Sequence, residues 1–286
     1  MVILYNSFGV NAKSPTTYFV TSLAIADLLV CSTYYPILSI EYSSIAAGER
    51  NIKHALFCEI ASTVTCAGVA LSIANLLAIT TDRYIYVSRP LKYPMIMTWR
   101  KTYIILSIIW FAAVVNVNFV YFSAGKPDTH ILYCRTSLVS FTFFFTLNVS
   151  APLSGVLIFN YKIYNVARKQ RRRIDRESIS SSYAGNQETS SGRTARRRTY
   201  TQQLKQIKTF GFIVLALLLC IIPTVIVNGI QIFCKYCVPT SVYIASGSIF
   251  VANSAVNPII YTVRSREYRL AFRRFYYKIT NRNFES

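Results

Sequence analysis

Six long apolar stretches recur along this chain of 286 residues and constrain its fold more than any other feature. They cover residues 17–40, 55–80, 102–122, 138–159, 209–233 and 238–263. Each has the roughly 20 residues that a helix needs to cross about 30 Å of hydrocarbon. With 53% hydrophobic and 15% charged residues, the chain is also too apolar for an ordinary soluble domain. We therefore predict six complete membrane-spanning helices.

The segment before the first complete span implies a seventh helix. Residues 1–10 are too short to cross a bilayer, and they lack the charged region and cleavage site of a signal peptide. They lead into a short polar turn at residues 11–15, as the last turns of a truncated helix would. We predict an all-α membrane fold, a single seven-transmembrane helix bundle with six complete spans and a truncated first helix.

The net charge of +20 could suggest a nucleic-acid-binding protein, so the distribution of the charge is decisive. Nearly all lysines and arginines lie in alternate loops, at Lys13, in residues 83–101, in residues 168–208 and in the tail from Arg264. This asymmetry is typical of a multi-pass membrane protein whose basic loops face the cytoplasm. We expect a plasma-membrane protein and no nucleic-acid partner.

The longest cytoplasmic connection, residues 166–208, is basic and of low complexity. It begins with an arginine run at residues 171–173, continues with a serine-rich stretch and ends with a second arginine run at residues 196–198. We expect residues 168–203 of this loop to be largely disordered, with charges that lie near anionic lipid headgroups rather than a specific binding motif.

Four cysteines fall on the side opposite the basic loops, which faces an oxidising compartment. They are Cys58, Cys134, Cys234 and Cys237. We therefore expect two disulfides. A zinc or redox role for the C-x-x-C at residues 234–237 is the less favoured alternative, because no second ligand pair accompanies it.

Asp27 lies in the middle of an apolar span, where a carboxylate costs about 2.5 to 3.5 kcal/mol. It should therefore face the bundle interior and have partners. Ser72, Asn253, Ser254 and Asn257 are also mid-span and could join Asp27 as oxygen ligands of a sodium ion. A water-mediated polar network without an ion is the alternative.

Two short motifs lie at the cytoplasmic ends of the third and seventh helices, if the truncated helix is counted as the first. The first is Asp82, Arg83 and Tyr84, followed in the loop by Pro90 and Leu91; the second is Asn257, Pro258 and Tyr261. A proline inside a membrane helix removes a backbone hydrogen bond and kinks the helix, and a neighbouring polar side chain can satisfy the freed group.

Together these motifs resemble the rhodopsin-like G-protein-coupled receptors. The likeness rests on L-A-I-A-D at residues 23–27, the D-R-Y at residues 82–84 and N-S-A-V-N-P-I-I-Y at residues 253–261, with Trp110, Pro152 and Pro223 in three further spans. It covers the whole chain, including an amphipathic helix at residues 265–277 within a tail that ends at residue 286.

The resemblance implies a receptor, not an enzyme, that binds an extracellular small molecule. Arg83 and Tyr261 would rearrange as the sixth helix moves outward to admit a heterotrimeric G protein, and Leu91 would contact that protein. Arrestin, a receptor kinase and membrane lipids are further expected partners. The family's spacing also implies that Cys58 pairs with Cys134.

Within this class the nearest resemblance is to adenosine receptors. Pro223, Asn228 and the cysteines at residues 234 and 237 reproduce their spacing, and an amide such as Asn228 can donate and accept hydrogen bonds at a purine edge. The resemblance places the ligand among residues of the outer helix ends and the second outer loop: Asn228, Thr65, Cys66, Val69, Thr136 and Phe250.

Departures from the receptor patterns leave the ligand open. An opsin would carry a lysine between residues 238 and 261, an amine receptor an aspartate at Thr65, and an adenosine receptor an aromatic residue at Thr136. Four switch positions also differ, with Ile221, Leu217, Gln203 and Asn160 in place of Trp, Phe, an acid and Tyr. The alternatives are an amine- or peptide-responsive receptor and a non-signalling decoy or dimerising homologue. A transporter is disfavoured, since the sequence has no internal inverted repeat.

Overall fold

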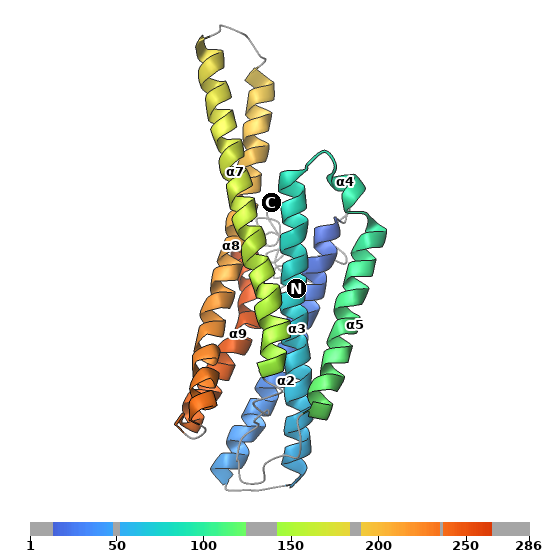
Figure 1. Cartoon of the computed structure of the whole chain (residues 1–286), viewed down its shortest axis with the longest axis vertical. Coiled ribbons are helices and arrows are strands. Elements are labelled where there is room, and N and C mark those ends of the chain that lie inside the picture. The colour runs from blue at the N-terminus through green and yellow to red at the C-terminus, as the bar shows by residue number, and fades with distance from the viewer. Residues whose placement is uncertain (1–13, 48–51, 124–141, 184–189, 235–236, 265–286) are drawn as a thin grey trace, which may run out of the picture.

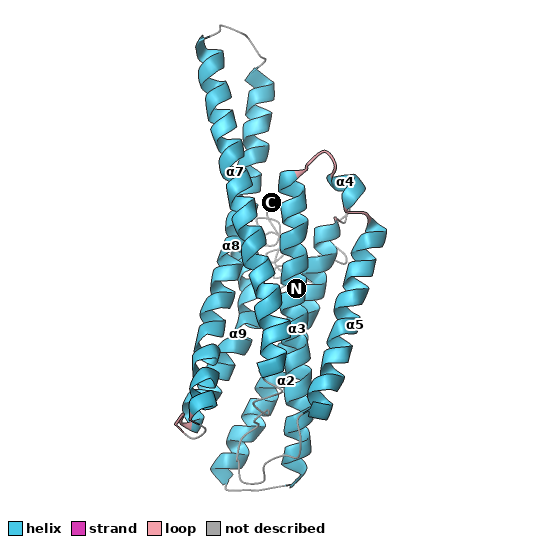
Figure 2. Cartoon of the chain, in the orientation of Figure 1, coloured by secondary structure: helices cyan, strands magenta, loops and turns pink. Residues whose placement is uncertain are grey.

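The computed structural model describes residues 14–47, 52–123, 142–183, 190–234 and 237–264, and nearly all of them are helical (Figures 1 and 2). The predicted all-α fold is confirmed for this part of the chain. In order along the chain, the elements are α2 (Pro15–Ala47), α3 (Ile52–Ser88), α4 (Tyr93–Ile96), α5 (Trp99–Ser123), the π-helix η2 (Phe145–Ser150), α7 (Ala151–Tyr183), α8 (Ser190–Phe233) and α9 (Thr240–Arg264).

Each of the six predicted spans coincides with a helix, because a chain in hydrocarbon must satisfy its backbone hydrogen bonds internally. Four stretches among the described residues are long and apolar enough to cross a membrane: Pro15–Ile40, Thr63–Ser88, Thr142–Gln170 and Gly211–Gln231. Helices α5 and α9 have 25 residues each. At 1.5 Å per residue they are about 38 Å long, which also suffices.

Helix α3 lies at the centre of the bundle. It packs against α2, α5 and α7, while α9 packs against α8 and α2 (Figure 1). The core between them is apolar and holds fully buried side chains such as Phe19, Ile73 and Leu217. Small residues allow close helix contacts, as expected in a membrane bundle. A Cβ atom added to Gly68 of α3 would lie 2.4 Å from Val30 of α2.

The π-helix η2 precedes Pro152 and explains how α7 accommodates this residue. A proline has no backbone N–H, and its ring would clash with the carbonyl four positions earlier in an α-helix. One wide turn relieves that clash. The backbone N–H of Ala151 accordingly donates to the carbonyl of Thr146, five residues back.

The predicted disorder of residues 168–203 is wrong for most of that segment. Helix α7 continues to Tyr183 and α8 begins at Ser190, so both helices extend past the end of α3 and lie side by side there (Figure 1). Charge and serine content suggested disorder, but arginine, lysine and glutamine favour helix. A helix that is already formed in the membrane also extends without a new nucleation cost.

Two predicted elements fall outside the described residues. They are the truncated first helix at residues 1–10 and the amphipathic helix at residues 265–277.

Candidate functional site

Asp27 is the centre of a polar cluster in the middle of the bundle, formed by α2, α3 and α9. Its side chain is 2% exposed. The Ser72 hydroxyl donates to Oδ1 of Asp27 at 2.8 Å, and the Asn257 amide donates to Oδ2 at 3.0 Å. The Ser254 hydroxyl approaches the same carboxylate. Side chains 45 and 230 positions apart in the sequence therefore converge on one buried acid.

The cluster also presents oxygen atoms that fit a small cation. Oδ1 of Asn253 and Oδ1 of Asn257 are buried, and neither has a hydrogen-bond partner within the described part of the chain. No group of three or more His, Cys, Asp or Glu side chains occurs among the described residues. One carboxylate with neutral hydroxyl and amide oxygens suits a hard monovalent cation better than a transition metal. These residues therefore fit the predicted sodium ion.

A second polar cluster lies near the cytoplasmic end of α3. Asp82 is fully buried and lies 3.2 Å from the Arg83 guanidinium. The Thr16 hydroxyl donates to Oδ2 of Asp82 at 2.6 Å, and the Tyr93 hydroxyl donates to Oδ1 at 2.7 Å. Arg83 also donates to Thr16 and lies over the ring of Tyr86, 5.5 Å from its centroid. This arrangement holds the arginine toward α2.

Tyr93 supports this cluster electrostatically as well as by its position. Burial, followed by the Asp82 carboxylate, raises the pKa of Tyr93. The phenol therefore keeps its proton at neutral pH and remains a hydrogen-bond donor to Asp82. Leu91, two residues earlier, is 93% exposed, as a residue that contacts a partner must be.

The sequence analysis did not identify Thr16 or Tyr93. Thr16 lies 66 positions from Asp82, and a threonine at the start of a helix is unremarkable. Tyr93 is one of 21 tyrosines in the chain. Only the helix packing brings either hydroxyl to the acid, so neither had a local sequence signal.

The remaining predicted switch residues belong to α3, to the turn before α4 and to α9. Tyr84 packs against Phe159 of α7, with ring centroids 5.4 Å apart. Pro90 lies in the exposed turn before α4. Pro258 and Tyr261 belong to α9, but their side chains are outside the described residues, as is the side chain of Gln203 in α8.

The predicted ligand residues of α3 lie in its outer half. Thr65 is buried, and its hydroxyl lies 3.5 Å from that of Thr33 in α2. Val69 belongs to the apolar core, and Cys66 and Phe250 pack against that core. Cys66, Val69 and Phe250 therefore all contribute to the apolar interior of the bundle. Thr136 lies outside the described residues.

Asn228 belongs to a different polar group, at the contact between α8 and α9. It is buried, and its amide donates to the carbonyl of Thr224 at 2.8 Å. The Thr224 hydroxyl donates to the carbonyl of Ser246 in α9 at 2.9 Å. This bond uses one of the two N–H groups of the Asn228 amide, so the other N–H and Oδ1 stay available for a two-pronged contact.

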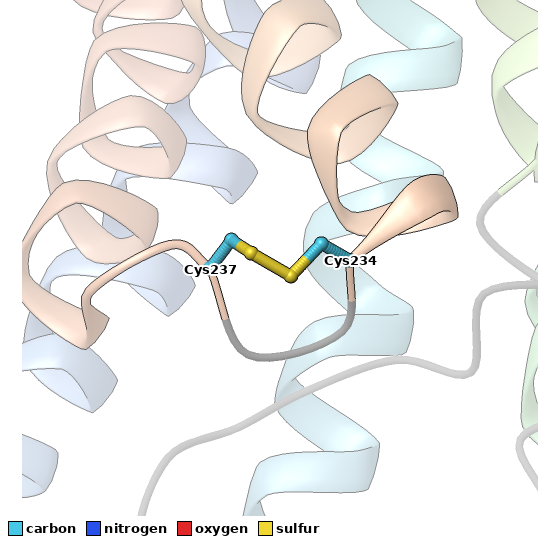
Figure 3. Close-up of a disulfide and its surroundings, with 2 residues drawn as sticks. All are labelled: Cys234 and Cys237. Carbon is cyan, nitrogen blue, oxygen red and sulfur yellow. A yellow bond between two sulfur atoms is a disulfide. The ribbon is translucent and has the colours of Figure 1, made fainter.

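The outer ends of α8 and α9 are joined by a disulfide between Cys234 and Cys237 (Figure 3). It lies in the short connection between the two helices, as the outer location of the cysteines predicted. The other predicted pair, Cys58 with Cys134, lies outside the residues whose side chains are described.

Three of the departures from the receptor pattern are visible in the structure. Leu217 and Ile221 are 1% and 4% exposed and belong to the apolar core. The Asn160 amide donates to the carbonyl of Val156 in its own helix at 2.8 Å. The neighbouring Tyr161 is 67% exposed and points out of the bundle.

Comparison with known proteins identifies relatives over nearly the whole chain. A family model described as "7 transmembrane receptor (rhodopsin family)" matches residues 1–261. The alpha-1A adrenergic receptor of Oryzias latipes is 28% identical over 284 residues, which cover 92% of this chain and 60% of that receptor. The human alpha-1A adrenergic receptor is 28% identical over 297 residues, covering 95% of this chain and 63% of that receptor. The octopamine receptor beta-1R of Drosophila melanogaster is 26% identical over 294 residues, covering 91% and 54%.

These relatives bear on the class of protein more than on its ligand. The chain spans at most 63% of the length of these three receptors. The comparisons do not support the finer resemblance to adenosine receptors, which stays a prediction.

Proposed function

Because this chain belongs to the rhodopsin family of seven-transmembrane receptors, we propose that it carries a signal from an extracellular small molecule to a heterotrimeric G protein. Its relatives are receptors rather than enzymes, and the chain is a multi-pass protein of the plasma membrane. The cytoplasmic cluster of Asp82, Arg83 and Thr16 carries the proposal. It holds a charged arginine at the end of α3, and Leu91 in the following loop is exposed, where a partner could contact it.

The test of this proposal is recruitment of a G protein by the full-length gene product in cells. Recruitment should be measured by energy transfer to labelled Gα subunits, with surface expression quantified in parallel. We expect at least one Gα class to be recruited, and Leu91→Ala to weaken recruitment. Recruitment of none, at normal surface levels, would favour a non-signalling decoy or dimerising receptor.

The ligand site of the proposed receptor lies between the outer halves of α3, α8 and α9. Thr65, Cys66 and Val69 would line it from α3, Phe250 from α9 and Asn228 from α8. The buried hydroxyl and amide groups support a neutral ligand with hydrogen-bonding groups, and a nucleoside remains one candidate. Screening nucleosides, amines and short peptides for G-protein recruitment would separate these classes.

A sodium ion at Asp27 is the second part of the proposal. The buried, unpartnered oxygens of Asn253 and Asn257 support it, together with the Ser72 hydroxyl that already contacts Asp27. The bound ion would favour the inactive packing of the bundle. Arrestin, a receptor kinase and membrane lipids are the further partners we propose.

A further inference from the structure

Helix α7 has two distinct faces where it leaves the membrane. Its inner face carries buried residues at Val156, Ile163 and Ala167. The Gln170 amide continues that face and donates to the carbonyl of Val87 in α3 at 3.1 Å. This hydrogen bond fixes the rotation of α7 about its axis at the cytoplasmic end of the bundle.

The rotation determines where two arginines point. Positions two apart on an α-helix are separated by about 200° around the axis. Arg168 and Arg172 each lie two positions from Gln170, so they must face away from α3, and both are exposed. Lys169, between them, is exposed as well. These three side chains form a basic patch on the outer face of α7.

The side chains on the outer face of α7 change along the helix from apolar to aromatic to basic. This is the order of the hydrocarbon, interface and headgroup layers of a membrane. Leu157 and Ile158 are 42% and 53% exposed, Tyr161 and Tyr164 are 67% and 58% exposed, and the basic patch follows. Apolar, aromatic and cationic side chains in this order fit acyl chains, the interface and phosphates. Residues 157–172 contain no acidic residue.

One hydrogen bond gives the height of the basic patch on the bundle. Gln170 donates to the carbonyl of Val87, one residue before α3 ends at Ser88. Arg168 and Arg172 therefore lie level with the end of α3, where the chain enters the basic loop of residues 89–101. Basic side chains at the cytoplasmic ends of membrane helices lie close to the lipid headgroups.

Lys162 lies deeper in the bundle than the basic patch, and its charge has aromatic partners there. Its ammonium lies 5.9 Å from the ring centroid of Tyr84 and 5.6 Å from that of Phe159. Aromatic faces attract a cation and reduce the cost of holding it near hydrocarbon. The two arginines of the basic patch have no such aromatic partner among the contacts of the described residues, and they are one helical turn apart.

We propose that Arg168 and Arg172 bind the headgroup phosphate of an anionic phospholipid in the cytoplasmic leaflet. Side chains four positions apart on a helix are neighbours about 6 Å apart at Cβ, and two like charges there repel. A phosphate between them removes that repulsion, and each guanidinium can bind it with two parallel hydrogen bonds. The tyrosines and leucine below the patch accommodate the acyl chains. The inference depends on membrane topology and not on coupling to a G protein.

The experiment measures lipid binding to the purified full chain by native mass spectrometry. Phosphatidylserine and phosphatidylcholine with identical acyl chains are the probes. The unmodified chain should prefer phosphatidylserine. Arg168→Gln/Arg172→Gln should weaken binding of phosphatidylserine by about fivefold for each arginine removed. Arg168→Lys/Arg172→Lys keeps the charge but loses the paired hydrogen bonds, so its affinity should be intermediate.

The matched control is Arg89→Gln/Arg100→Gln, which removes two exposed cytoplasmic arginines outside α7 and leaves the same net charge. Its affinity for phosphatidylserine should equal that of the unmodified chain. Unchanged binding in the α7 double variant would overturn the proposal, as would an equal loss in the control. Displacement of phosphatidylserine by excess inorganic phosphate would show a site for free phosphate and would also overturn it.

Discussion

The Thr16 hydroxyl connects the buried Asp82 carboxylate to the Arg83 guanidinium, and such a contact can shift the equilibrium between the resting and active states of a receptor. Thr16 donates to Asp82 and accepts from Arg83, so it satisfies both partners at once. Hydrogen bonds to charged groups are worth about 1.5 to 3 kcal/mol, more than bonds between neutral groups. Because Thr16 belongs to α2, this pair of bonds restrains Arg83 toward α2.

Thr16→Val should therefore raise ligand-free signalling. The valine keeps the volume of the side chain and removes both hydrogen bonds, and a net loss of about 1 kcal/mol corresponds to about a fivefold shift in the resting equilibrium. Nucleotide exchange by a G protein would be measured at equal surface expression. Thr81→Val is the control, since that hydroxyl donates to the carbonyl of Leu77 in its own helix. Equal exchange by both variants would contradict the assigned role of Thr16.

Asp27 should determine how the protein responds to sodium. If a sodium ion binds Asp27, Ser72, Asn253 and Asn257, it stabilises the folded chain. Sodium at about ten times its Kd would add about 1.4 kcal/mol. The melting temperature of the purified chain should thus be higher in sodium chloride than in choline chloride. Asp27→Asn should remove that difference. An equal sodium effect in the variant would leave the water-mediated network as the better interpretation.

Contacts between helices depend on small residues at the points of closest approach. Gly68 of α3 lies against Val30, which is fully buried in α2 and has a stiff, β-branched side chain. By contrast, a Cβ atom on Gly211 of α8 would have no other atom within 4 Å. The same substitution should therefore have opposite effects at these two glycines.

Gly68→Ala should lower the free energy of unfolding by about 1 to 3 kcal/mol, the usual cost of overpacking. Gly211→Ala should stabilise the chain by about 0.5 to 1 kcal/mol, because alanine loses less entropy in a helix. Thermal unfolding of both variants in the same detergent would measure this. Adding Val30→Ala to Gly68→Ala should recover part of the loss. A lower melting temperature for Gly211→Ala than for Gly68→Ala would refute the packing argument.

The helices could be predicted from the sequence where the membrane dictates them, and less well where it does not. Every complete span is helical where its residues are described, because a single segment in hydrocarbon can satisfy its own backbone hydrogen bonds only as a helix. The extensions of α7 and α8 were missed, because composition alone does not show that a helix continues from a membrane anchor. Asp27 and Ser72 could be paired because each is an isolated polar residue in an apolar stretch. Thr16 and Tyr93 lie near polar loops, where their hydroxyl groups do not stand out.

At the scale of the whole molecule, the proposed activation requires α8 to move relative to α3. Within the described residues, α8 packs mainly against α9 and to a lesser extent against α7. The cluster around Asp82 connects α3 to α2 and α4. We infer that a salt bridge between Arg83 and an acidic residue of α8 would add a restraint on α8 to these contacts.

Gln203→Glu tests this inference. The resemblance places an acidic residue at this position of α8, where it could pair with Arg83 and hold the cytoplasmic ends of the two helices together. An added pair in a wet, partly exposed site is worth about 1 kcal/mol at most. Ligand-free signalling should therefore fall by up to about fivefold. Because Thr16 also binds Arg83, the two substitutions act on the same guanidinium, and the double variant should depart from additivity. Nucleotide exchange would be compared among the unmodified chain, both single variants and the double variant at equal surface expression. No decrease in the glutamate variant, with simple additivity in the double variant, would show that position 203 does not set the resting balance.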